Sequence, residues 1–114
     1  MFHVEKCGEV AVLTATRRIE GGHRWTAREQ IDDLLGEGVD RLVVDLSLID
    51  LIDSSGLASL VAAFRRTESV RGRMCVCGLN DKVRSIFELT LLHEVIPLYS
   101  DREEALAAMA EEVD

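Results

Sequence analysis

The chain has 114 residues, of which 47% are hydrophobic, so it is long enough for one compact domain over residues 1–114 and too short for two. Its net charge of −8 disfavours nucleic acid and anionic membrane as partners, because both bind positively charged surfaces. The sequence contains neither an apolar run of about 18 to 20 residues nor the basic and apolar start of a secretory signal, so we expect a cytoplasmic protein.

The first third of the chain predicts a β-hairpin followed by a helix. Residues 2–7 and 10–16 read as two strands, and the Gly-Glu pair between them marks a turn. Two adjacent glycines then interrupt the chain. From Thr26 onward, apolar residues recur at helical spacing until Gly36 ends the helix.

Two short segments in the middle of the chain, residues 41–46 and 74–78, predict inner strands. Both are continuously apolar at their centres, which is typical of strands that are buried on both faces. Between them, a helix that begins near Ser55 carries apolar residues at positions i, i+3, i+4 and i+7.

The C-terminal part predicts a helix, an edge strand and a last helix. Asn80 is a favoured N-cap for the first of these helices. Residues 95–99 predict a short edge strand, because Pro97 has no N–H to donate to a sheet. Asp101 caps the last helix. Its inward-facing residues are expected to be Leu106, Met109 and Ala110.

The resulting order, β-β-α-β-α-β-α-β-α, predicts an α/β fold. Repeated strand–helix–strand crossovers imply parallel strands, and the first hairpin adds an antiparallel pair. We therefore expect a mixed, mostly parallel sheet of about four or five strands that packs against about four helices.

The cysteines and histidines give no sign of metal, cofactor or redox chemistry. Cys75 and Cys77 lie two residues apart in a predicted strand, so they share one face and are poorly placed for a disulfide or a metal fork. We expect both to be buried, inert thiols. The three histidines lie in separate segments without ligand spacing, so we expect no metal site and no cofactor.

The segment at residues 45–57 carries the most information about function. A buried strand is followed by a short apolar connection and by a helix that starts at Asp53-Ser54-Ser55-Gly56. Asp and Ser are preferred N-cap residues, so this tetrapeptide by itself needs no function beyond capping. A helix N-terminus also offers unpaired N–H groups and a partial positive charge, which would tolerate a phosphoserine. The helix face nearby is small and is expected to admit another protein closely: Ser55, Ala58, Ser59, Ala62 and Ala63.

The sequence V-V-D-L-S-x-I-D-x-I-D-S-S-G-L-x-x-L at residues 43–60 resembles the signature of STAS domains, specifically the bacterial anti-sigma-factor antagonists. The likeness covers about residues 39–110. It implies that Ser54 is phosphorylated by an anti-sigma factor with GHKL-type serine kinase activity. It also implies that the unphosphorylated protein binds this anti-sigma factor and releases a sigma factor, and that a PP2C-type phosphatase restores it. The residues expected to contact the partner are Asp53, Ser55, Gly56, Ala58, Ser59 and Glu20.

The sequence departs from this family pattern in two places. A G-E-L-D-like turn is usual after the second strand, whereas residues 17–25 are longer, more basic and without aspartate. We expect this segment to be a solvent-facing loop that contributes to partner choice: either the partner is unusual, or the turn is rebuilt with Glu20 in the acidic role. Leu91 stands where a glycine is common after the third helix.

Two other functions fit the resemblance or the serine less well. A STAS scaffold or lipid-transport module would not need the hydroxyl groups of Ser54 and Ser55, although the unusual 17–25 segment keeps this alternative open. A hydrolase would need a G-x-S-x-G elbow, which is absent, and an acid to orient His93. We therefore expect a protein without catalytic residues.

Overall fold

The structure, a computed structural model, describes residues 2–16 and 27–110. Its elements in chain order are β1 (Phe2–Cys7), β2 (Val10–Ala15), α1 (Ala27–Gly36), β3 (Arg41–Asp45), α2 (Ser54–Ser69), β4 (Arg73–Cys77), α3 (Asp81–Leu89), the short 3₁₀ helix η1 (Leu92–Glu94), β5 (Leu98–Tyr99) and α4 (Arg102–Ala110). The predicted order is confirmed, with η1 added.

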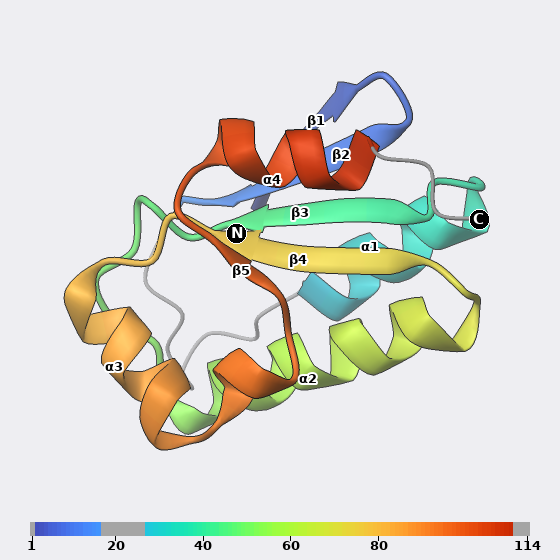
Figure 1. The fold of residues 1–114 in the computed structure, drawn as a ribbon. Helices are drawn as coiled ribbons and strands as arrows, with labels where there is room; N and C mark the ends of the chain where they lie inside the picture. Colours follow the sequence, from blue (N-terminus) through green and yellow to red (C-terminus); the bar gives the residue numbers. More distant parts are fainter. Residues whose placement is uncertain (1, 17–26, 111–114) are drawn as a thin grey trace.

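The strands form one sheet in the order β1-β2-β3-β4-β5. β1 pairs antiparallel with β2, and the other neighbours are parallel. The predicted mixed α/β fold is therefore confirmed, and β3 and β4 are inner strands as expected. Figure 1 shows α1, α2 and α3 on one face of the sheet and α4 on the other.

Alternation along the strands divides the core into two clusters. Because successive side chains point to opposite faces, Val44 of β3 packs in the large cluster under α1 to α3, whereas Val43 packs in the small cluster under α4. The small cluster is completed by Ala105 and Met109 of α4. Ala110 is exposed, contrary to the prediction, because it lies well around the helix from the Ala105–Met109 stripe.

The last strand is shorter than the sequence predicts. The carbonyl of Pro97 accepts a hydrogen bond from the N–H of Val76 (3.0 Å), but strand pairing covers only Leu98 and Tyr99. Proline offers an acceptor without a donor, which limits β5 to a short edge strand. Of the earlier residues in the predicted strand, Val95 is the C-cap of η1 and Ile96 is fully buried.

The thiols of Cys75 and Cys77 are fully buried, as predicted. Burial raises the pKa of each to about 12, so neither forms an appreciable thiolate near neutral pH. Cys7 is exposed. We expect a disulfide reagent at pH 8 to label Cys7 alone in the native protein and all three cysteines after denaturation. Rapid labelling of more than one thiol in the folded chain would contradict this burial.

Leu91, at the family's glycine position, adopts a left-handed backbone with φ +61°. This conformation costs an L-residue about 1 to 2 kcal/mol, and the side chain of Leu91 is largely exposed, so its packing offsets little. Leu91→Gly should stabilise the fold by about 0.5 to 1 kcal/mol in urea unfolding, after the added freedom of glycine in the unfolded chain is subtracted. Leu89→Gly, at an exposed helical position, is the matched control and should destabilise by about 1 kcal/mol. A loss of stability in both variants would show that Leu91 is not strained.

Candidate functional site

Helix α2 begins at Ser54, because Asp53 caps it. The Asp53 backbone is extended, its Oδ1 accepts from the N–H of Gly56 (2.8 Å), and its carbonyl accepts from the N–H of Leu57 (3.0 Å). The helix therefore starts one residue before the predicted start near Ser55. Ser54 and Ser55 are both exposed in the first turn, at the positive end of a 16-residue helix.

The helix face beyond the serines is only partly available to a partner. Ala58 is exposed and Ser59 is half-buried, whereas Gly56 is buried and its N–H is held by Asp53. Ala63 is fully buried in the main core, contrary to the expected small surface face, because it lies three residues after the buried Leu60 on the same helix stripe. Glu20 and the rest of segment 17–25 lie outside the described residues.

The connection between β3 and α2 buries two isoleucines and exposes two leucines. Ile49 and Ile52 are almost fully buried, while Leu48 is 66% exposed and Leu51 is 43% exposed. The connection is held in place by hydrogen bonds, since Asn80 Nδ2 donates to the carbonyl of Ile49 (3.0 Å). Two apolar side chains are thus presented to solvent on a packed segment that leads directly to Ser54. Sequence reasoning missed them, because nothing in L-I-D-L-I indicates which apolar pair faces inward.

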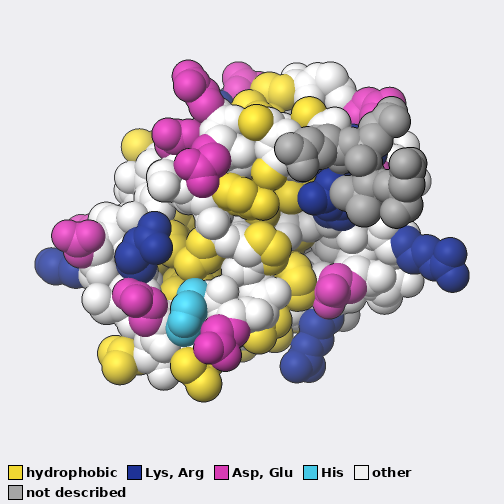
Figure 2. Space-filling view, in the orientation of Figure 1, with side chains coloured by type: hydrophobic (Ala, Val, Ile, Leu, Met, Phe, Trp, Pro, Cys, Tyr) yellow, Lys and Arg dark blue, Asp and Glu magenta, His cyan; other side chains and the backbone are white. Residues whose placement is uncertain are grey.

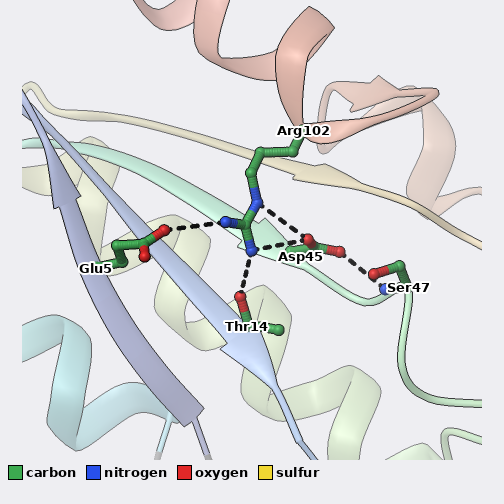
Figure 3. A network of polar contacts seen from close by, with 5 residues as sticks. All are labelled: Glu5, Thr14, Asp45, Ser47 and Arg102. Carbon is green, nitrogen blue, oxygen red and sulfur yellow. Dashed lines mark hydrogen bonds and ion pairs between the residues drawn. The ribbon is translucent and has the colours of Figure 1, made fainter.

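A polar network joins the start of α4 to strands β1, β2 and β3 (Figure 3). Arg102 donates to Asp45 Oδ2 (3.2 and 3.3 Å), to Thr14 Oγ1 (2.7 Å) and to Glu5 Oε2 (3.0 Å). The other oxygen of Asp45 accepts from the N–H of Ser47 (2.9 Å). This network was also missed by sequence reasoning. The only available signal was an acidic residue at the end of a buried strand, which calls for a partner.

Other chemistry finds no support in the described part of the chain. Within residues 2–16 and 27–110, no group of three or more His, Cys, Asp and Glu is placed to hold a metal ion. No helix among these residues is long and apolar enough to cross a membrane. His93 Nδ1 lies 3.4 Å from the carbonyl of Phe87, at the end of α3. Figure 2 shows acidic side chains spread over the visible face rather than gathered in one patch.

Comparison with known proteins places the chain among bacterial regulators. A family model described as the STAS domain matches residues 2–105. The chain is 33% identical over 84 residues to BtrV of Bordetella bronchiseptica, covering 70% of this chain and 72% of BtrV. It is 32% identical over 91 residues to the anti-sigma-B factor antagonist of Listeria monocytogenes, covering 80% of this chain and 72% of the relative. The crystal structure of an anti-sigma factor antagonist from Mycobacterium paratuberculosis is similar, with a TM-score of 0.84, 26% identity and coverage of 97% of this chain and 94% of that one.

Proposed function

Because this chain belongs to the STAS domain family, among the anti-sigma-factor antagonists, we propose that it works as a phosphorylation switch controlled at Ser54. In its unphosphorylated form it binds an anti-sigma factor, which then releases a sigma factor. The observation that carries this proposal is the exposed Ser54 in the first turn of the Asp53-capped helix α2. The names of the relatives favour this role over a scaffold or lipid-transport module.

The first turn of α2 suits a phosphate group electrostatically. A phosphoserine adds a charge of about −1.5 to −2, which the partial positive charge of a helix N-terminus stabilises. The domain need not refold, because Ser54 is already outside the core. The added charge acts instead on a protein that docks at this end of the helix.

The partners follow from the family. The anti-sigma factor is the binding partner, and we propose that it also carries the GHKL-type serine kinase activity that phosphorylates Ser54. A PP2C-type phosphatase would remove the phosphate. This exchange takes place where bacterial sigma factors act, in the cytoplasm, and it gives the chain itself no catalytic step.

Phosphosite mapping tests the choice of serine. Ser54 and Ser55 are both exposed, so exposure does not distinguish them as phosphate acceptors. Capping does not occupy either hydroxyl, because Asp53 is the N-cap. Incubation with candidate kinases and ATP should place the phosphate on Ser54. Ser54→Ala should abolish labelling, and Ser55→Ala, the matched control, should retain it. Labelling that survives Ser54→Ala would overturn the proposal.

Leu48 and Leu51 are expected to contribute to partner binding. They are exposed on a segment fixed by the burial of Ile49 and Ile52, so little ordering is needed when a partner covers them. Changing both to Ser should weaken binding of the anti-sigma factor by about 1 to 3 kcal/mol, or about 5- to 150-fold, with the unfolding free energy changed little. Calorimetric titration measures this effect. Leu89→Ser is the control, because Leu89 is 84% exposed and lies on helix α3 rather than on the connection between β3 and α2. Equal loss of affinity in the control and the double variant would remove the leucines from the interface.

A further inference from the structure

The carboxylate of Asp45 ties helix α4 to the segment that leads to Ser54. One of its oxygens accepts from two nitrogens of Arg102, at the first residue of α4. The other accepts from the N–H of Ser47, two residues beyond β3. Figure 3 shows Asp45 between Arg102 and Ser47, in contact with both. One side chain therefore connects two parts of the fold that are far apart in sequence.

This carboxylate has little freedom to take another position. The Asp45 side chain is only 8% exposed, so its charge depends on the guanidinium and the amide that face it. On its third side lies Gly78, where a Cβ atom would sit 2.9 Å from Asp45 Oδ1 and 2.9 Å from Ser47 Cβ. Thr14 Oγ1, itself largely buried, accepts from Arg102 and fixes the guanidinium from the neighbouring strand.

The position of Ser47 constrains the rest of the connection. The N–H of Ile49 donates to the carbonyl of Leu46 (3.2 Å), which closes a turn around Ser47. Ile49 and Ile52 then enter the core, and Asp53 caps α2. The segment from Asp45 to Ser54 is thus held at its start by the Arg102 network and at its end by the helix cap.

We propose that Arg102 is a positioning residue for the switch: through Asp45 it fixes the segment 46–53, and so the presentation of Ser54 to the kinase and the anti-sigma factor. The effect on phosphorylation and on binding of the anti-sigma factor rests on the proposed function. The positioning of segment 46–53 is a property of the free protein and can be measured without a partner. Glu5 holds the outer side of the same guanidinium and has no bond to the segment, so it provides a matched comparison.

Hydrogen exchange of the free protein tests the positioning without any partner. Arg102→Gln should speed hydrogen exchange of the amides of residues 46–57 by about tenfold or more. Exchange at the centre of β4 should change much less. Glu5→Gln should leave residues 46–57 unchanged. Equal exchange of this segment in both variants, or an equal increase over the whole sheet in Arg102→Gln, would overturn the proposal.

Two further measurements complete the test. In the unaltered protein, the Ser47 amide should be protected from exchange although it lies outside a strand, and an unprotected Ser47 amide would overturn the proposal even if Arg102→Gln did not fold. With a kinase that labels Ser54, Arg102→Gln should lower kcat/KM about tenfold through misplacement of the serine. An unchanged kcat/KM would also overturn it. Failure of the unaltered protein to be labelled would count against the proposed function and leave the exchange result to decide the positioning.

Discussion

Phosphorylation of Ser54 should lower the affinity for the anti-sigma factor about 30- to 150-fold, which corresponds to about 2 to 3 kcal/mol. The phosphate would add a charge of about −1.5 to −2 to a chain whose net charge is already −8, at an exposed site that the proposed partner would cover. A desolvated charge without a partner is costly in an interface, so the loss should appear mainly as faster dissociation. Calorimetry of the phosphorylated and unmodified proteins against the same partner measures the difference.

Three variants separate the contributions at this site. Ser54→Ala should fold, resist phosphorylation and bind the partner as the unmodified protein does. Ser54→Asp carries one charge without phosphate geometry, so it should weaken binding less than the phosphate does. Ser55→Ala is the matched control and should respond to phosphorylation normally. Equal affinities of the phosphorylated and unmodified proteins would rule out the switch, even though the fold would be unaffected.

Gly78→Ala should lower the free energy of unfolding by about 2 to 5 kcal/mol. Gly78 has φ +75°, a conformation that costs an L-residue about 1 to 2 kcal/mol. The added Cβ would also lie 2.9 Å from Asp45 Oδ1 and from Ser47 Cβ, and such overpacking costs typically about 1 to 3 kcal/mol. Asp45 is buried and held by Arg102, and the backbone N–H of Ser47 is bound to Asp45, so both neighbours have little room to move. Urea unfolding monitored by circular dichroism gives the change.

Gly8→Ala is the matched control for the Gly78 variant. Gly8 also has a positive φ, +65°, but a Cβ there would meet no atom within 4 Å. It should therefore show only the conformational cost, about 1 to 2 kcal/mol. If the two variants lost equal stability, the close approach of Gly78 to Asp45 and Ser47 would carry no energetic weight. The amount by which the loss at Gly78 exceeds the loss at Gly8 measures the contribution of this close contact.

The order of elements, the hairpin of strands predicted at 2–7 and 10–16, the inner strands and the caps at Asn80 and Asp101 could all be predicted from the sequence. These features depend on residues close together in the chain. Apolar periodicity of two or 3.6 residues, a proline without N–H, and side chains that cap their own helix act over a few residues, so the sequence displays them directly. The resemblance at residues 43–60 added the family, which the comparisons confirm.

Only the tertiary structure decided what depends on contacts between distant segments. It determined that Ile49 and Ile52 are buried while Leu48 and Leu51 are exposed, because α3 and the sheet, not the local pattern, offer the space. It turned Ala63 inward and left Ala110 exposed, since each stripe is set by the element packed against it. It also joined Arg102 to Asp45, 57 residues away, because the parallel β3 brings its carboxyl end to the start of α4. A charge pair of this kind has no local signature, since its geometry exists only once the sheet has formed.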